Sequence, residues 1–331
     1  MSKASPDPVK EVRSYAFHLP PFLKRLLEGR SGGGDDPLAR QYIPQAAEQI
    51  LSPGEDSDPI GDYAHAPVPS IVHRYPDRAL LKLTHACAVY CRYCFRRDMV
   101  GPGGIGIEKD EIAQGLDYIE NHKEIWEVIL TGGDPLIVSP LRLAAVLERL
   151  EAIEHVKTIR IHTRVPLACP EKMTPDFCAL FARGAKPVYM ALHVNHAAEL
   201  TREVRGAIAN LRRAGVILLS QSVLLRGVND NVEALENLFR ALVEAGVKPY
   251  YLHHPDKAPG TAHFRLAVAE GQALVRALQG RVSGICLPAY MLDIPGGHGK
   301  VPLTPCYARG AEDGTYILTD FNGQDHSYKD E

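Results

Sequence analysis

The sequence lacks several features that would assign the protein to a class at once. No apolar run reaches the roughly 18 residues that a membrane-spanning helix needs. The first residues contain no apolar core of a signal peptide. A net charge of −3 provides no overall basic field for nucleic acid. These absences argue against membrane proteins and general nucleic-acid binders, and they make a cytoplasmic location the expectation.

The cysteines do not suit a disulfide framework either. There are seven, an odd number, and a disulfide-rich secreted domain usually has an even number in a shorter chain. Three of them lie within eight residues, at Cys87, Cys91 and Cys94. With 331 residues, 45% of them apolar, the chain can bury a full core without disulfides. A reducing compartment, in which the clustered thiols serve metal or redox chemistry, fits this distribution.

From about residue 79 the sequence alternates short apolar runs with helical patterns. Strands are predicted at 79–84, 127–133, 157–163, 187–194, 216–225 and 247–254. Helices are predicted at 108–122, 141–153, 174–184, 197–214, 231–245 and 266–279. Six such units imply an α/β protein with a parallel sheet and right-handed crossovers. Because no nucleotide-binding signature follows the first strand, a partial (βα)6 TIM-like barrel is favoured over a doubly wound sheet.

The segments on either side of this pattern differ from it. We predict an N-terminal helical and irregular segment at 1–75, the barrel at 76–285 and a short C-terminal extension at 286–331. Helical pieces in 9–29 are interrupted by two prolines, and the acidic, breaker-rich stretches 31–37 and 51–62 are typical of linkers. The extension contains a glycine-rich loop and one predicted strand, 315–320.

The three cysteines have the spacing C-x3-C-x2-C directly after the first predicted strand. In a parallel barrel the loops after the strands form the active face. Three thiolates can hold three irons of a [4Fe–4S] cluster and leave the fourth iron open. Zinc, with His85 or a distant cysteine as the fourth ligand, and unligated thiols are the alternatives. Three arginines lie in the same segment: Arg92, Arg96 and Arg97. They could offset the negative charge of thiolates and sulfide or bind carboxylates, and the alternative is a basic loop that is exposed to solvent.

This motif in this position resembles the radical S-adenosylmethionine (SAM) superfamily. The resemblance implies that the open iron binds SAM and that SAM yields a 5′-deoxyadenosyl radical. The sequence TGGDP (131–135), with Gly132, Gly133 and Asp134, resembles the loop that contacts the SAM amino group, although a tight turn would also need glycine. GPGGIG (101–106) has the letters of a dinucleotide fingerprint but does not follow a strand, so we interpret it as a flexible loop.

A second motif, DIPGGHGK, presents Lys300 after three glycines. It is not a Walker loop, because the glycine six residues earlier and the following Ser or Thr are missing. A lysine on such a loop can form a Schiff base with a carbonyl cofactor, or it can be an exposed lysine without a role.

Several segments in order resemble the lysine 2,3-aminomutases, which combine SAM, an iron–sulfur cluster and pyridoxal 5′-phosphate (PLP). They are HRYPDRAL (73–80), the cysteine motif with its two following arginines, TGGDP, QSVLLRGVNDN (221–231), PYYLHHPDKAPGTAHFR (249–265) and LDIPGGHGK (292–300). The resemblance covers about 230 residues. It implies an isomerase that moves an amino group from C2 to C3 of an amino acid.

The resemblance also implies a role for individual residues. The three cysteines ligate the [4Fe–4S] cluster, and Lys300 forms the Schiff base with PLP, which Tyr75 and Arg78 contact. The SAM side is lined by Gly132, Gly133, Asp134, His193 and Gln221. Arg96 binds the substrate carboxylate, and Asp256 and Asp293 hold the ε-ammonium of lysine. A guanidinium suits a carboxylate, and two carboxylates suit an ammonium while they repel a glutamate side chain.

Some features depart from the family pattern and leave alternatives open. Asn231 stands where the longer enzymes have a zinc cysteine, so we expect no structural zinc, and a homo-oligomer is left open. The short chain resembles the branch that serves a lysine of translation elongation factor P, whereas LDIPGG resembles the enzymes of free L-lysine. A radical SAM enzyme that consumes SAM without PLP is a further alternative. In every radical case a reducing electron donor is a required partner.

Overall fold

A nine-stranded sheet forms the body of the protein in the computed structural model, which describes residues 15–30, 33–101, 107–310 and 314–330. Its strands are adjacent in chain order. They are β1 (Ile71–Tyr75), β2 (Arg78–Thr84), β3 (Glu127–Gly132), β4 (Thr158–Thr163), β5 (Val188–His193), β6 (Ile217–Val223), β7 (Lys248–His253), β8 (Ala289–Ile294) and β9 (Gly299–Pro302). Strands β2 to β8 are parallel, and β1 and β9 are antiparallel strands at the two edges.

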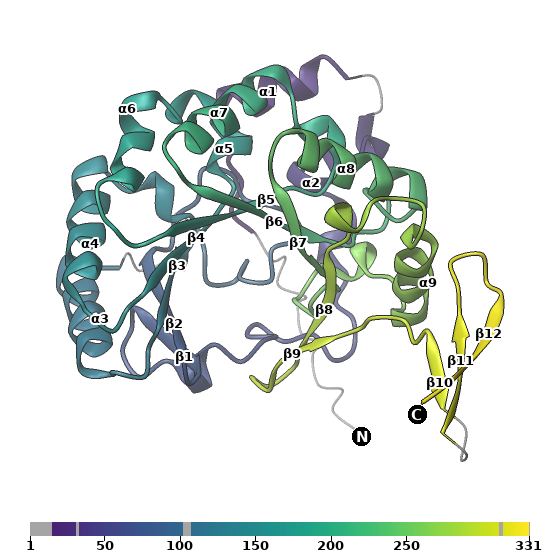
Figure 1. The fold of residues 1–331 in the computed structure, drawn as a ribbon. Coiled ribbons are helices and arrows are strands. Elements are labelled where there is room, and N and C mark those ends of the chain that lie inside the picture. Colours follow the sequence, from purple (N-terminus) through teal and green to yellow (C-terminus); the bar gives the residue numbers. More distant parts are fainter. Residues whose placement is uncertain (1–14, 31–32, 102–106, 311–313, 331) are drawn as a thin grey trace, which may run out of the picture.

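Helices cover the outer side of this curved sheet (Figure 1). They are α1 (Pro21–Glu28), α2 (Ala39–Tyr42), α3 (Lys109–Asn121), α4 (Pro140–Ala152), α5 (Val165–Ala168), α6 (Pro175–Cys178), α7 (Arg202–Arg213), α8 (Val232–Glu244) and α9 (Val268–Leu278). The alternation of parallel strands and helices confirms the predicted partial barrel. Among the described residues, no helix is long and apolar enough to cross a membrane.

The helices form because their apolar residues recur at helical spacing behind a capping residue. In α7, Val204, Ala207, Ile208 and Leu211 are all buried in the hydrophobic core, while the rest of the helix is largely polar. Thr201 accepts a hydrogen bond from the N–H of Val204 and so caps the first turn. Ser139 and Asn231 cap α4 and α8 in the same way.

Most of the predicted elements are confirmed. The six predicted strands correspond to β2 to β7, and 315–320 corresponds to β11 (Thr315–Thr319). The single helix predicted at 174–184 is wrong: α6 ends at Cys178 and continues as a short 3-10 helix, η6 (Ala179–Ala182). Most of GPGGIG lies outside the described residues. The start of the N-terminal helical pieces predicted in 9–29 also lies outside them, and the part that is described contains α1.

Two groups of strands were not predicted. The main sheet also includes β1, β8 and β9. It therefore continues across the domain boundaries proposed at residues 75 and 285, and those boundaries stay a prediction. The glycine-rich segment predicted as a loop is a hairpin of β8 and β9. The chain then forms a separate three-stranded sheet beside α9, with β10 (Ala308–Gly310), β11 and β12 (Asp325–Lys329) (Figure 1).

A side-chain hydrogen bond joins the two edges of the main sheet. The hydroxyl of Tyr75, at the end of β1, accepts a hydrogen bond of 2.8 Å from the backbone N–H of Lys300 on β9. The β8–β9 hairpin is thereby held opposite the first strands, and the space between them becomes part of the barrel interior.

Candidate active site

The barrel interior contains a cavity of about 450 Å³. All fourteen residues that the sequence predicts for the site line this cavity. They are Tyr75, Arg78, Cys87, Cys91, Cys94, Arg96, Gly132, Gly133, Asp134, His193, Gln221, Asp256, Asp293 and Lys300. The fold therefore brings one set of side chains together from strand ends and loops that are far apart in the sequence.

Two arginines fix the cysteine loop to the N-terminal segment. Arg92 and Arg97 both donate to the carboxylate of Glu48 in the 3-10 helix η2 (Ala46–Gln49). The three side chains are at most 4% exposed. Of the roles predicted for these two arginines, binding a carboxylate is confirmed, and the alternative of a solvated loop is wrong.

The surroundings of Cys87 and Cys94 disfavour the ionised form of their thiols. Burial, with the nearby Cys91 adding to it, raises the pKa of Cys94 to about 11. Burial, with Asp134 adding to it, also raises the pKa of Cys87 well above its usual value. Cys87 and Cys94 are therefore protonated in the free protein, and a bound metal must displace their protons. Three cavity-facing cysteines are a donor set that fits a [4Fe–4S] cluster with one open iron.

The glycines of TGGDP lie against the backbone that follows β2. Gly132 has a φ of +120°, in the region that favours glycine. A β-carbon on Gly133 would lie 2.0 Å from the carbonyl oxygen of Ala86. Close packing therefore accounts for both glycines, and a contact of this loop with SAM stays a prediction.

Asp134 is engaged by neighbouring groups of the protein. Its carboxylate accepts hydrogen bonds from the N–H of Leu136 at 3.1 Å, the hydroxyl of Thr163 at 2.8 Å and the N–H of Arg164 at 2.7 Å. These contacts join the ends of β3 and β4. Asp134 therefore helps to hold the rim of the cavity in place, and a role toward SAM stays a prediction.

His193 and Gln221 are paired neighbours at the ends of β5 and β6. Burial, with the charge of Arg164 adding to it, lowers the pKa of His193 to about 3. The side chain is therefore neutral near pH 7. The amide nitrogen of Gln221 lies 3.4 Å from a ring nitrogen of His162, a cavity residue that was not predicted. This side of the cavity thus presents neutral hydrogen-bonding groups.

Lys300 follows a hairpin turn in which Gly296, Gly297 and Gly299 have φ angles of +82°, +85° and +90°. The backbone N–H of Lys300 donates to the hydroxyl of Tyr75. The guanidinium of Arg78 lies over the ring of Tyr75, with its central carbon 3.8 Å from the ring centre. The three residues predicted to contact PLP therefore form one contiguous group.

The two predicted acids face the same cavity. The ammonium of Lys300 donates to both oxygens of Asp293, at 2.7 and 2.6 Å. Asp293 therefore already holds an ammonium group, the kind of group that the sequence assigns to it. Asp256 follows β7, and its burial, with the charge of Asp293 adding to it, raises its pKa to about 7. The two carboxyls thus interact electrostatically.

Arg96 has a partner that the sequence did not predict. It donates from Nε and Nη2 to Oδ2 of Asp62 at 2.9 and 2.7 Å. Arg74 donates to Oδ1 of the same carboxylate at 3.1 Å. Asp62 lies in 51–62, so the linker prediction is wrong for this residue. Arg74 could have been found from its place in HRYPDR, whereas no local signal marks Asp62.

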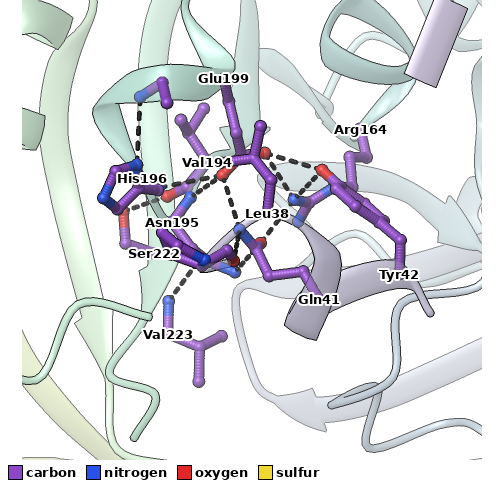
Figure 2. A network of polar contacts seen from close by, with 12 residues as sticks. Leu38, Gln41, Tyr42, Arg164, Val194, Asn195, His196, Glu199, Ser222 and Val223 are labelled. Atoms are coloured by element: carbon purple, nitrogen blue, oxygen red, sulfur yellow. Dashed lines mark hydrogen bonds and ion pairs between the residues drawn. The ribbon is translucent and has the colours of Figure 1, made fainter. Parts of the chain in front are cut away.

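A second buried network was also missed. Figure 2 shows Glu199 surrounded by donors from the N-terminal segment and the barrel. Its carboxylate accepts from Gln41 at 3.3 Å, from the Tyr42 hydroxyl at 2.9 Å and from Arg164 at 2.5 Å. The network docks α2 against the ends of β4 and β5. Because Arg164 also lines the cavity, the N-terminal segment helps to hold its wall in place.

A parallel partial barrel with three cysteines on the loop after its first parallel strand defines a radical SAM protein. The family model of the Radical SAM superfamily matches residues 81–242, and that of Lysine-2,3-aminomutase matches residues 275–331. L-lysine 2,3-aminomutase of Clostridium subterminale is 37% identical over 319 residues, 96% of this chain and 76% of that protein. The chain belongs to the lysine 2,3-aminomutase family.

Two other relatives show the range of this similarity. L-lysine 2,3-aminomutase of Escherichia coli (strain K12) is 42% identical over 290 residues, 87% of this chain and 83% of that protein. Glutamate 2,3-aminomutase of Clostridioides difficile (strain 630) is 35% identical over 308 residues, 93% of this chain and 72% of that protein. Family membership implies a [4Fe–4S] cluster, SAM and PLP as cofactors.

Proposed function

We propose that the protein is a PLP-dependent radical SAM enzyme that converts L-lysine to β-lysine by moving the α-amino group to the β-carbon. The observation that carries this proposal is the ammonium of Lys300 on Asp293. This pair supports an ammonium-binding role for Asp293, and Asp256 faces the same cavity as a second acid. A glutamate side chain would instead be repelled by these two carboxyls.

Each group of residues has a distinct task in this proposal. The three cysteines hold the cluster, and Lys300 holds PLP beside Tyr75 and Arg78. Arg96 binds the substrate carboxylate, while Asp256 and Asp293 bind the ε-ammonium. When bound, the cluster and SAM supply a carbon radical for hydrogen abstraction, and PLP carries the migrating amino group. The barrel surrounds the substrate and limits the access of water to the radical.

The substrate of this site is free lysine rather than a lysine within a protein chain. Arg96 requires a free carboxylate, and the reaction requires a free α-amino group; a residue inside a polypeptide has neither. If the product serves translation elongation factor P, we therefore propose that lysine is converted before it is attached. Acid hydrolysis of elongation factor P after incubation with the enzyme, followed by chromatography of the amino acids, should then yield no β-lysine.

The function is tested by anaerobic reconstitution with iron, sulfide, SAM and PLP, followed by chromatographic separation and mass spectrometry of the products, because each β-amino acid has the same mass as its substrate. Lysine, arginine and glutamate are offered in parallel, and β-lysine is the expected product. Formation of β-glutamate, or no product from lysine, contradicts the substrate assignment.

Lys300→Ala tests the use of PLP separately. The variant should lose the visible absorbance of lysine-linked PLP, whereas Lys123→Ala, a change at an exposed lysine, should keep it. A radical SAM enzyme without PLP would consume SAM and show no difference between the two variants.

We also propose a cytoplasmic location, because all seven cysteines are free thiols and an iron–sulfur site needs a reducing compartment. A reducing electron donor is then available to the cluster.

A homo-oligomer is proposed from exposed aromatic residues on the C-terminal sheet, where Tyr316 and Tyr328 are paired across β11 and β12. Light scattering of the purified protein measures the mass of the assembly, and a monomeric mass contradicts this part of the proposal.

A further inference from the structure

Five charged side chains of alternating sign form a continuous chain along the cavity wall. Their order is Arg96, Asp62, Arg74, Asp293 and Lys300. The successive nitrogen–oxygen distances are 2.7, 3.1, 3.6 and 2.6 Å. The first four side chains are at most 12% exposed, so their interactions are only weakly screened by water. Asp62 joins Arg96, the arginine proposed to bind the substrate carboxylate, to the other three charged side chains.

The position of Asp62 is fixed by its own loop. Its backbone N–H donates to Oδ1 of Asp58 at 2.8 Å. Gly61, directly before it, has a φ of +68°, and a β-carbon there would lie 2.4 Å from the backbone nitrogen of Gly297. His65 adds a hydrogen bond of 3.0 Å to the carbonyl of Gly297. The loop is therefore packed against the hairpin that carries Lys300, and Asp62 cannot swing away without breaking this contact.

Asp62 occupies only one edge of the Arg96 guanidinium. The Nε and Nη2 atoms bind its carboxylate, whereas Nη1 lies 3.4 Å from the hydroxyl of Thr131, a residue that also lines the cavity. A guanidinium has five N–H donors and can bind carboxylates along more than one edge. The edge that contains Nη1 is thus left for a ligand in the cavity.

We propose that Asp62 is a positioning residue that holds Arg96 so that its second edge binds the carboxylate of the amino acid substrate. This inference rests on the proposed function of Arg96. Arg74 provides a second positive charge beside Asp62, which offsets the repulsion between that carboxylate and the substrate carboxylate. Burial by itself raises the pKa of Asp62, but Arg96 and Arg74 outweigh it and the net pKa lies below the usual value. Asp62 is therefore ionised near pH 7.

A competing role for Asp62 would change the lysine affinity in the opposite direction when Asp62 is removed. If Asp62 merely filled the place of the substrate carboxylate, it would compete with lysine for Arg96, and its removal would tighten binding. If it positions Arg96, its removal lets the guanidinium turn toward other acids of the cavity and weakens binding. The direction of the change in lysine affinity therefore separates these two roles.

The test uses PLP-loaded protein without SAM, so that binding is measured without turnover. L-lysine and 1,5-diaminopentane are titrated separately while the absorbance of bound PLP is followed. The diamine keeps both amino groups and lacks only the carboxylate. Asp62→Asn should weaken lysine binding about tenfold or more, and the affinity for the diamine should change less than about twofold. Asp117→Asn, at an exposed ion pair with Arg149, is the matched control and should change neither affinity.

A general loss of structure in Asp62→Asn would weaken the binding of both ligands equally, and that result would overturn the inference. Tighter binding of lysine by the variant would overturn it as well. If Asp62→Asn does not load PLP, Asp62→Glu replaces it, because its longer side chain displaces the guanidinium; a smaller loss confined to lysine is then expected. Equal changes for both ligands in that variant would again overturn the inference. A wild-type protein whose absorbance responds to neither amine contradicts the proposed function itself, which distinguishes the two failures.

Discussion

Acidification from pH 8 to pH 6 should impair the use of L-lysine through the protonation of Asp256. The pKa of this carboxyl in the free protein is about 7, because burial and the charge of Asp293 both disfavour its ionised form. Only the ionised carboxylate attracts the substrate ammonium. A group with this pKa is about 90% ionised at pH 8 and about 10% ionised at pH 6. Its titration alone should therefore lower kcat/KM about tenfold over this range, since kcat/KM reports the ionisation of the free enzyme.

The assay is kcat/KM for L-lysine under anaerobic conditions at pH 6, 7 and 8 and constant ionic strength. Asp256→Asn is measured beside the wild type, because the slope that remains in the variant belongs to the substrate amino group and other residues. At pH 8 the variant should be about tenfold to a hundredfold less efficient, the loss of one charged contact. Parallel pH profiles for the two proteins would refute the assignment of this titration to Asp256.

The same pKa predicts a stability effect of opposite direction. Because the pKa of Asp256 is raised in the folded protein, the folded state keeps a proton that the unfolded chain loses between about pH 4 and pH 7. Stability from this group is therefore present at low pH and is lost as the pH rises through 7. A shift from 3.8 to about 7 corresponds to about 4 kcal/mol. Asp256→Asn should raise the Tm of the cofactor-free protein at pH 8, with a gain that disappears toward pH 4.

Two further substitutions test how the cysteine loop is held. Glu48→Gln leaves Arg92 and Arg97 buried without a carboxylate and should reduce the free energy of unfolding by about 3–5 kcal/mol in a urea titration; an unchanged transition midpoint would contradict this. Gly133→Ala places a β-carbon 2.0 Å from a backbone oxygen and should lower both the Tm and the iron content after reconstitution. Gly206→Ala, in α7 with nothing within 4 Å of the added carbon, should instead stabilise by about 0.5–1 kcal/mol.

The barrel could be predicted because its signals are local. Each strand of the six units is a short apolar run, and most of the following helices repeat their apolar residues every three or four positions. The hairpin of β8 and β9 could not be predicted in this way. Its strands are short, and the glycines and prolines around them are typical of loops, so only pairing of β8 with β7 makes the segment a strand.

The sequence by itself predicted the residues of the site, because the cysteine motif, the lysine after three glycines and the ordered segments that resemble the lysine 2,3-aminomutases are all patterns that can be read along the chain. Only the tertiary structure decided which charges are paired. Glu48 and Asp62 lie in a segment without regular periodicity. The two arginines that bind Glu48 are 44 and 49 positions away along the chain, and Arg96 is 34 positions from Asp62. Such pairs depend on how the N-terminal segment packs against the barrel, and no short-range pattern records that packing. The sequence therefore identified Arg96, while the fold identified the carboxylate that orients it.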